Sequence, residues 1–140
     1  MFNPATGIHY LERNPAGRQA VLLLHGLGVD GRSWLPQFDD LAGAGFRLLA
    51  ADIPGFGRSK VPWARWSLRS AALLLSAFMA DLGIGQYCLV GLSMGGVVAQ
   101  QIGELGPLLH EVEAREGRDL LGEAVRAEHL AQDDARVVEA

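Results

Sequence analysis

The sequence predicts an α/β fold, in which a mostly parallel sheet is flanked by helices. Three short runs are dominated by apolar residues, as expected for strands covered on both faces: residues 20–24, 46–51 and 87–90. The stretches between these runs are long enough to hold a helix each, and parallel strands need such crossovers. The alternation of strand and helix therefore favours a parallel sheet.

A further strand is predicted at residues 7–13, before the first apolar run, and the Asn-Pro-Ala-Gly stretch at residues 14–17 is typical of a turn. We expect residues 7–13 to form an edge strand. His9 lies within this strand, and we expect it to be a surface residue without a catalytic role.

Two helices are indicated by their capping residues. The first is predicted at residues 34–42, with Ser33 as its N-cap. The second is predicted at residues 67–82, where Ser67 caps the start and Gly83 ends the helix.

The length and charge of the chain limit the classes of function. At 140 residues the chain is long enough for a single hydrophobic core. Its formal net charge is −4, and the absence of a basic stripe argues against a nucleic-acid partner. The longest apolar-rich run, residues 71–80, is far too short to cross a bilayer, so we expect no membrane span.

The N-terminus and the single cysteine bear on the cellular location. Residues 1–4 lack the basic region and the apolar run of a signal peptide. Cys88 cannot form an internal disulfide, and we expect it to be buried in the strand at residues 87–90. We therefore expect a cytoplasmic protein. We also expect neither a metal ion nor a cofactor.

The stretch after the last apolar run carries the main chemical motif. Residues 91–95 form the pattern G-x-S-x-G between a predicted strand and a predicted helix. A sharp turn there strains the backbone of Ser93, and Gly91 and Gly95 remove the Cβ atoms that would collide. The turn exposes the Ser93 hydroxyl beside the N-terminus of the following helix. The helix dipole and the Met94 N–H favour negative charge at that point.

A second glycine pattern suggests a competing hypothesis, a dinucleotide-binding domain. Gly26, Gly28 and Gly31 match G-x-G-x-x-G after a strand, and Asp52 ends the next strand. In a dinucleotide site the helix begins within the glycines, so that its N-terminus meets the pyrophosphate. Here the predicted cap, Ser33, places the helix start after the glycine loop, which disfavours this hypothesis.

Three motifs together resemble the landmarks of the α/β-hydrolase family. They are His-Gly-Leu-Gly at residues 25–28, Asp-Ile-Pro-Gly-Phe-Gly-Arg-Ser at residues 52–59 and Gly-Leu-Ser-Met-Gly-Gly at residues 91–96. Their order and spacing are similar to those of small serine carboxylesterases. The resemblance covers about residues 7–103, which would be the N-terminal part of an α/β-hydrolase fold.

The resemblance implies roles for five residues. Ser93 would be the nucleophile, and the backbone N–H groups of Leu27 and Met94 would form the oxyanion hole. His25 would hold its loop rather than act as the base, and Asp52 would order the loop at residues 54–59. Because serine occupies the nucleophile position, the epoxide hydrolases and dehalogenases of the family, which use aspartate, are disfavoured. The substrate would be a small carboxylic ester or a similar acyl compound.

The chain departs from the family after residue 103. Residues 103–140 carry 10 acidic and 4 basic side chains, and residues 104–140 contain no convincing buried strand. We expect residues 1–103 to form the N-terminal hydrolase core. We expect residues 104–140 to form an acidic, helical tail in place of the later strands, so that the fold is truncated.

A serine nucleophile needs a base and an orienting acid. After Ser93 the only histidines are His110 and His129. Chain order allows Glu104 with His110, or Asp119 with His129, as acid and base. We expect the residues of both pairs to be solvent-exposed residues on helices instead. The sequence therefore does not assign the acid or the base.

Three classes of function follow from these observations. The first is a serine hydrolase that works through an acyl-enzyme intermediate. The second is a truncated, catalytically inactive hydrolase or a non-catalytic binding protein, and the third is the dinucleotide-binding domain. Without later strands the edge at residues 87–90 would be open, so we expect self-association through it. For the same reason we expect the chain alone to have low stability and no esterase turnover above background.

Overall fold

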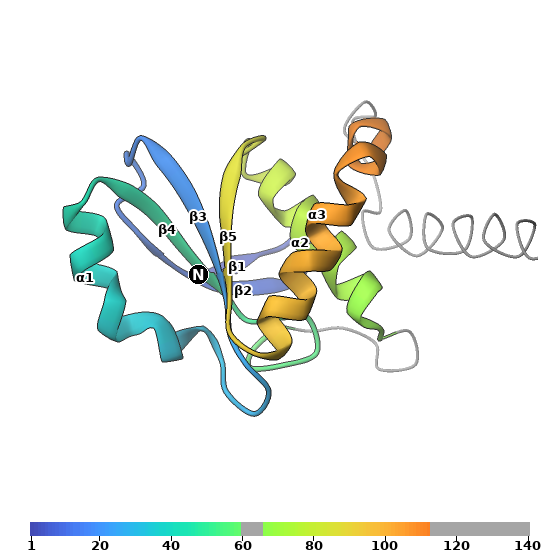
Figure 1. Ribbon diagram of the computed structural model, residues 1–140, viewed down its shortest axis with the longest axis horizontal. Coiled ribbons are helices and arrows are strands. Elements are labelled where there is room, and N and C mark those ends of the chain that lie inside the picture. Colours follow the sequence, from blue (N-terminus) through green and yellow to red (C-terminus); the bar gives the residue numbers. More distant parts are fainter. Residues whose placement is uncertain (60–65, 113–140) are drawn as a thin grey trace, which may run out of the picture.

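A computed structural model describes residues 1–59 and 66–112 of the protein, with side chains described up to residue 105 (Figure 1). Its elements, in chain order, are β1 (Phe2–Asn3), β2 (Ile8–Arg13), β3 (Gln19–Leu24), the 3₁₀ helix η1 (Gly31–Trp34), α1 (Leu35–Gly43), β4 (Phe46–Ala51), α2 (Leu68–Asp81), β5 (Tyr87–Gly91) and α3 (Met94–Val112).

The five strands form one sheet in the order β1-β2-β4-β3-β5. β4, β3 and β5 are parallel, whereas β1 and β2 pair antiparallel with their neighbours. The predicted fold class, a mostly parallel sheet with flanking helices, is confirmed. The expectation of an edge strand at residues 7–13 was wrong, because β2 lies between β1 and β4. β1 is only two residues long, too short for the sequence pattern to predict it.

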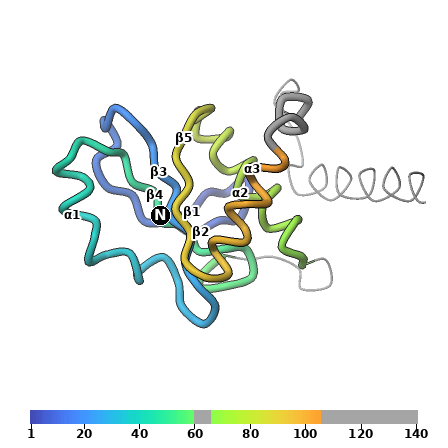
Figure 2. Tube along the Cα trace, in the orientation of Figure 1, coloured from blue at the N-terminus to red at the C-terminus, as the bar shows by residue number. Residues whose placement is uncertain are grey.

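Helices cover both faces of the sheet, so the core has two layers (Figures 1 and 2). On one face, α2 and α3 pack against alternate residues of the central strands, among them Leu22, Leu24 and Leu49. On the other face, Phe38 of α1 packs against the residues between them, such as Leu23. The period of two along each strand explains why the strands are apolar throughout.

The starts of the helices differ in how well the sequence predicted them. Ser67 caps α2 as predicted. Its hydroxyl accepts from the Ser70 N–H at 2.9 Å, and the Ser70 hydroxyl accepts from the Ser67 N–H, so the two residues form a capping box. Ser33 is not a cap, because a 3₁₀ turn precedes α1. The cap of that turn is Asp30, whose carboxylate accepts from the Arg32 N–H at 2.9 Å.

Cys88 is exposed, which corrects the expectation that it is buried. β5 has a single neighbour among the described strands, β3, so it lies at the edge of the sheet. Leu89 packs towards α2 and α3, whereas Cys88 and Val90 point to the face where no described helix covers β5. The Gln19 side chain lies across this face and donates to the Cys88 sulfur at 3.1 Å.

Candidate active site

Ser93 lies in the sharp turn between β5 and α3, as the motif predicts. It is one of two non-glycine residues with positive φ in the described part of the chain, and its φ is 53°. L-residues rarely adopt this conformation, so the turn stores strain at the residue that carries the hydroxyl. The surrounding structure must therefore hold the Ser93 backbone in this unfavourable conformation.

The flanking glycines leave no room for a side chain. A Cβ on Gly95 would collide with the backbone oxygen of Leu24 and would lie 2.6 Å from that of His25. A Cβ on Gly91 would lie 2.5 Å from the Gly96 nitrogen. The start of α3 is therefore packed directly against the end of β3, and only glycine fits at both positions.

Backbone hydrogen bonds hold the turn on the sheet. The Leu92 N–H donates to the Leu24 oxygen at 3.0 Å, which extends the β3–β5 ladder into the turn. The N–H groups of Gly96 and Val97 donate to the Ser93 oxygen at 2.9 and 3.3 Å, which begins the helix. Ser93 is thus attached both to the end of the sheet and to the first turn of α3.

The loop after β3, residues 26–31, passes beside Ser93, and we call it the oxyanion loop after the role that the resemblance implies for Leu27. A Cβ built on Gly26 would lie 3.7 Å from the Ser93 Cβ, an ordinary van der Waals distance, so the start of the loop lies next to Ser93. In the part of the chain that the structure describes, neither the Leu27 nor the Met94 backbone N–H donates to another protein atom. The hydrogen bonds within the described residues therefore leave both N–H groups available as donors.

His25 holds the start of the oxyanion loop. Its ring is fully buried, and its Nε2 accepts from the Ile53 N–H at 2.9 Å. Nδ1 lies 2.8 Å from the Gly26 oxygen, and because that oxygen can only accept, Nδ1 carries the proton. Both ring nitrogens are occupied, so His25 has a structural role, in agreement with the expectation from the sequence.

Asp52 is buried and holds two loops, whereas the sequence predicted that it holds only the loop at residues 54–59. Its Oδ1 accepts from the Gly31 N–H at 2.8 Å, at the end of the oxyanion loop. Its Oδ2 accepts from the Arg58 N–H at 2.9 Å, which orders the loop at residues 54–59 as expected. Backbone donors thus engage both oxygens inside the fold. This carboxylate is not presented to a ribose, which speaks against the dinucleotide hypothesis for Gly26, Gly28, Gly31 and Asp52.

His9 is not a simple surface residue, which corrects the expectation from the sequence. Its side chain is 16% exposed, and its Nδ1 lies 3.2 Å from Asp52 Oδ2. The antiparallel pairing of β2 with β4 places His9 opposite Asp52, since Tyr10 is in register with Ala51. No local motif marks this pair, because the two residues meet only through strand pairing.

The acidic residue of the oxyanion loop, Asp30, is paired with Arg32. The Arg32 Nη2 lies 2.7 Å from Asp30 Oδ2. Hydrogen bonds from the Arg32 side chain are the main cause that lowers the pKa of Asp30 to about 2. Asp30 is therefore ionised at neutral pH and caps η1 at the end of the loop.

The side chains next to Ser93 are exposed and apolar. Leu27 is 70% exposed, Leu92 58% and Val97 43%. Leu92 directly precedes Ser93, Val97 lies one helical turn after it, and Leu27 follows Gly26. Among the described residues, Leu92, Val97 and Leu27 thus present apolar side chains to solvent in the segments that adjoin Ser93.

The proposed acid–base pairs are not brought to Ser93 by the described residues. α3 is one helix that contains both Glu104 and His110, and at 1.5 Å per residue the His110 Cα lies about 24 Å along the axis from Met94. Glu104 is exposed and accepts from the Gln101 side chain at 2.9 Å. Asp119 and His129 lie outside the described residues, as does most of the predicted tail, and the boundary predicted after residue 103 falls within α3.

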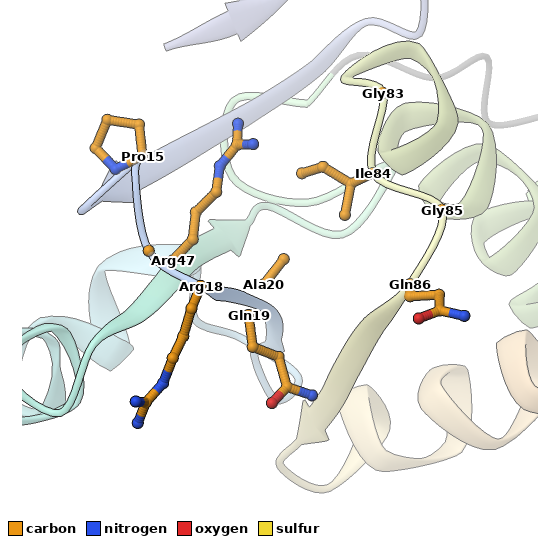
Figure 3. Close-up of a pocket in the computed structure, with 10 residues that line it drawn as sticks. Pro15, Arg18, Gln19, Ala20, Arg47, Gly83, Ile84, Gly85 and Gln86 are labelled. Atoms are coloured by element: carbon orange, nitrogen blue, oxygen red, sulfur yellow. The ribbon is translucent and has the colours of Figure 1, made fainter.

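A hollow of about 520 Å³ lies at the opposite end of the sheet (Figure 3). It is lined by residues at the starts of β3, β4 and β5, whereas Ser93 follows the end of β5. The side chains of Arg18 and Arg47 point in different directions there, and Arg47 pairs with Glu12 at 2.8 Å. We therefore do not assign this hollow to the chemistry of Ser93.

Residues 1–59 and 66–112 contain no group of three His, Cys, Asp or Glu side chains that could hold a metal ion. No helix among them is long and apolar enough to cross a membrane.

Comparison with known proteins gives matches over most of the described chain. A family model described as alpha/beta hydrolase fold matches residues 19–107. The chain is 40% identical over 90 residues to the dihydrolipoyllysine-residue acetyltransferase component of the acetoin cleaving system of Cupriavidus necator, covering 64% of this chain and 24% of that protein. It is 34% identical over 100 residues to bifunctional epoxide hydrolase 2 of Sus scrofa, covering 70% and 18%.

Among solved structures, a thermophilic esterase from Thermogutta terrifontis is similar with a TM-score of 0.64 and 32% sequence identity. The match covers 69% of this chain and 35% of the esterase. The chain thus spans between 18% and 35% of the length of these three proteins.

Proposed function

The chain belongs to the alpha/beta hydrolase fold family, and we propose that Ser93 is the nucleophile of a hydrolase that acts on a carboxylic ester or a similar acyl substrate. The observation that carries this proposal is the conformation of Ser93, with a φ of 53° between a strand and a helix. A strained, non-glycine residue at such a turn is the geometry of a nucleophile elbow. The similarity to an esterase supports the same substrate class.

In the proposed reaction the Ser93 Oγ attacks the carbonyl carbon of the ester as a base removes its proton. The tetrahedral intermediate carries a negative oxygen, which would accept from the Leu27 and Met94 N–H groups. Its collapse breaks the bond to the alcohol, which leaves with a proton, and an acyl-enzyme remains. Water then attacks the acyl carbon, releases the carboxylic acid and restores Ser93.

The identity of the nucleophile separates this proposal from other activities of the family. One relative is named an epoxide hydrolase, and the resemblance described above implies an aspartate nucleophile for that class. Here the position holds serine, and exposed leucine and valine residues lie close to it along the chain. Both features favour an acyl substrate with an apolar group.

Labelling with a fluorophosphonate probe tests the proposal. The probe forms a covalent bond with an activated serine, and peptide mapping identifies the residue. We expect an adduct on Ser93 that is absent in Ser93→Ala, the matched control that lacks only the hydroxyl. An adduct that persists in Ser93→Ala, or a protein that takes no probe, contradicts the proposal.

A second candidate, a protein that binds acyl ligands without turning them over, is favoured by a different observation. Among the described residues, no histidine is placed to deprotonate Ser93: both nitrogens of His25 are engaged, and His9 lies three strands away. Hydrolysis of p-nitrophenyl esters distinguishes the candidates. Turnover that depends on Ser93 supports the hydrolase, and His110→Ala and His129→Ala, tested separately, then show which of the two histidines is the base. Because a truncated, inactive hydrolase would also show only background turnover, the binding protein is supported by background turnover together with a rise in thermal stability when an acyl ligand is added.

A further inference from the structure

Three segments that are distant in the sequence meet at the Asp52 carboxylate. The end of the oxyanion loop donates through the Gly31 N–H at 2.8 Å, and the loop at residues 54–59 donates through the Arg58 N–H at 2.9 Å. Strand β2 adds the His9 ring at 3.2 Å. Both Asp52 oxygens accept from backbone N–H groups, so His9 Nδ1 is assigned as the donor in this contact.

The surrounding bonds reinforce the same junction. The His9 N–H donates to the Ser59 hydroxyl at 2.9 Å, and that hydroxyl donates to the Asp52 backbone oxygen at 2.6 Å. The Asp52 N–H donates to the His9 oxygen at 2.9 Å. Asp52 is only 4% exposed, so these protein donors replace the hydrogen bonds that water would make to its carboxyl group.

His9 is too far from Ser93 to act on it directly. The sheet order places β4 and β3 between β2 and β5. Neighbouring strands are about 4.8 Å apart, so the two residues are separated by about 14 Å across the sheet. Any effect of His9 on the chemistry at Ser93 must pass through Asp52 and the loops that it holds.

We propose that His9 and Asp52 are positioning residues for the oxyanion loop, with His9 acting through the Asp52 carboxylate. The inference rests on the proposed function of Ser93. The loop has two anchors: His25 fixes Gly26 at its start, and Asp52 fixes Gly31 at its end. The Leu27 N–H lies between them. The proposed function needs this N–H to face Ser93, and its direction depends on both anchors, because a segment held at one end samples many backbone conformations.

Matched substitutions at residue 9 isolate the side-chain contact. His9→Leu removes the donor to Asp52 and keeps the backbone bonds of β2. His9→Asn keeps an amide nitrogen at the position of Nδ1 and serves as the conservative rescue. Arg13→Ala, on the exposed end of the same strand, is the control that touches neither loop. Should His9→Leu fail to fold, His9→Phe replaces it, because its ring keeps the shape of the side chain without a nitrogen.

Amide hydrogen exchange measured by NMR reads the anchors without relying on activity. In His9→Leu we expect the Gly31 and Arg58 amides to exchange about tenfold faster, while the Leu22 amide in the core of β3 is unchanged. His9→Asn and Arg13→Ala should match the wild type. Unchanged exchange at Gly31 in His9→Leu, or an equal rise at Leu22, overturns the inference.

The rate at which the fluorophosphonate labels Ser93 connects the anchors to the chemistry. We expect slower labelling in His9→Leu and a rate near that of the wild type in His9→Asn. Equal rates in the wild type and His9→Leu overturn the positioning role. If no variant is labelled, the proposed function of Ser93 fails, and the exchange rates still decide whether His9 and Asp52 fix the loop.

Discussion

Replacing Gly95 by alanine should destabilise the turn at Ser93 more than the same change at Gly96 or Gly103 of α3. The new Cβ would collide with the Leu24 oxygen and would lie 2.6 Å from the His25 oxygen. Both are backbone atoms of the buried central strand and the residue after it, so neither can rotate away. Overpacking of this kind costs about 1–3 kcal/mol, and backbone neighbours place Gly95→Ala at about 3 kcal/mol.

Gly103 offers a matched control in the same helix. A Cβ at Gly103 meets nothing within 4 Å, so Gly103→Ala should gain the helix propensity of alanine, about 0.5–1 kcal/mol. The two variants make the same chemical change, and we expect them to differ by about 4 kcal/mol in the free energy of unfolding.

Urea denaturation followed by circular dichroism measures this difference. At an m-value of about 1–3 kcal/mol/M, a gap of about 4 kcal/mol separates the midpoints by more than about 1 M. Equal midpoints for Gly95→Ala and Gly103→Ala would show that α3 is not packed against the end of β3, and the geometry argued for Ser93 would fall with it.

Three further predictions concern local features of the fold. Ser93→Gly should be more stable than Ser93→Ala by about 1 kcal/mol, because glycine relieves the positive φ; equal unfolding midpoints would contradict the strain. Ser67→Ala should lower the free energy of unfolding by about 1 kcal/mol through loss of the capping box, whereas Ser33→Ala should leave it nearly unchanged. Both are measured by urea denaturation, and equal losses of stability would show that Ser33 is a cap after all. Because the folded pKa of Asp30 is lowered to about 2, its contribution to stability is present above about pH 4 and is lost as the pH falls towards 2. Arg32→Ala should raise that pKa in an NMR titration of the Asp30 carboxyl, and an unchanged pKa would refute the pairing.

Sequence patterns were sufficient where local chemistry decides the structure. The apolar run at residues 46–51 became β4 with the predicted bounds, and Ser67 capped α2, because apolar periodicity and capping act within a few residues. The G-x-S-x-G turn followed for the same reason. Its glycines are needed by contacts that the motif itself creates when strand and helix meet.

Contacts between strands that are distant in the chain could not be predicted from sequence patterns. The His9–Asp52 pair depends on β2 lying antiparallel beside β4, and residue spacing does not encode that neighbour. Cys88 was expected in the core because its strand is apolar, yet exposure depends on which elements cover each face of the sheet. Both errors concern the arrangement of elements rather than their identity.

A crystal structure of the protein after reaction with a fluorophosphonate tests the central claim most directly. The phosphonyl group on Ser93 would stand in for the tetrahedral intermediate, and its oxygen for the oxyanion. We predict that this oxygen accepts from the backbone N–H groups of both Leu27 and Met94 at about 2.7–3.1 Å. A phosphonyl oxygen turned away from both groups, or the absence of an adduct on Ser93, would contradict the assignment of this turn as the site of acyl chemistry.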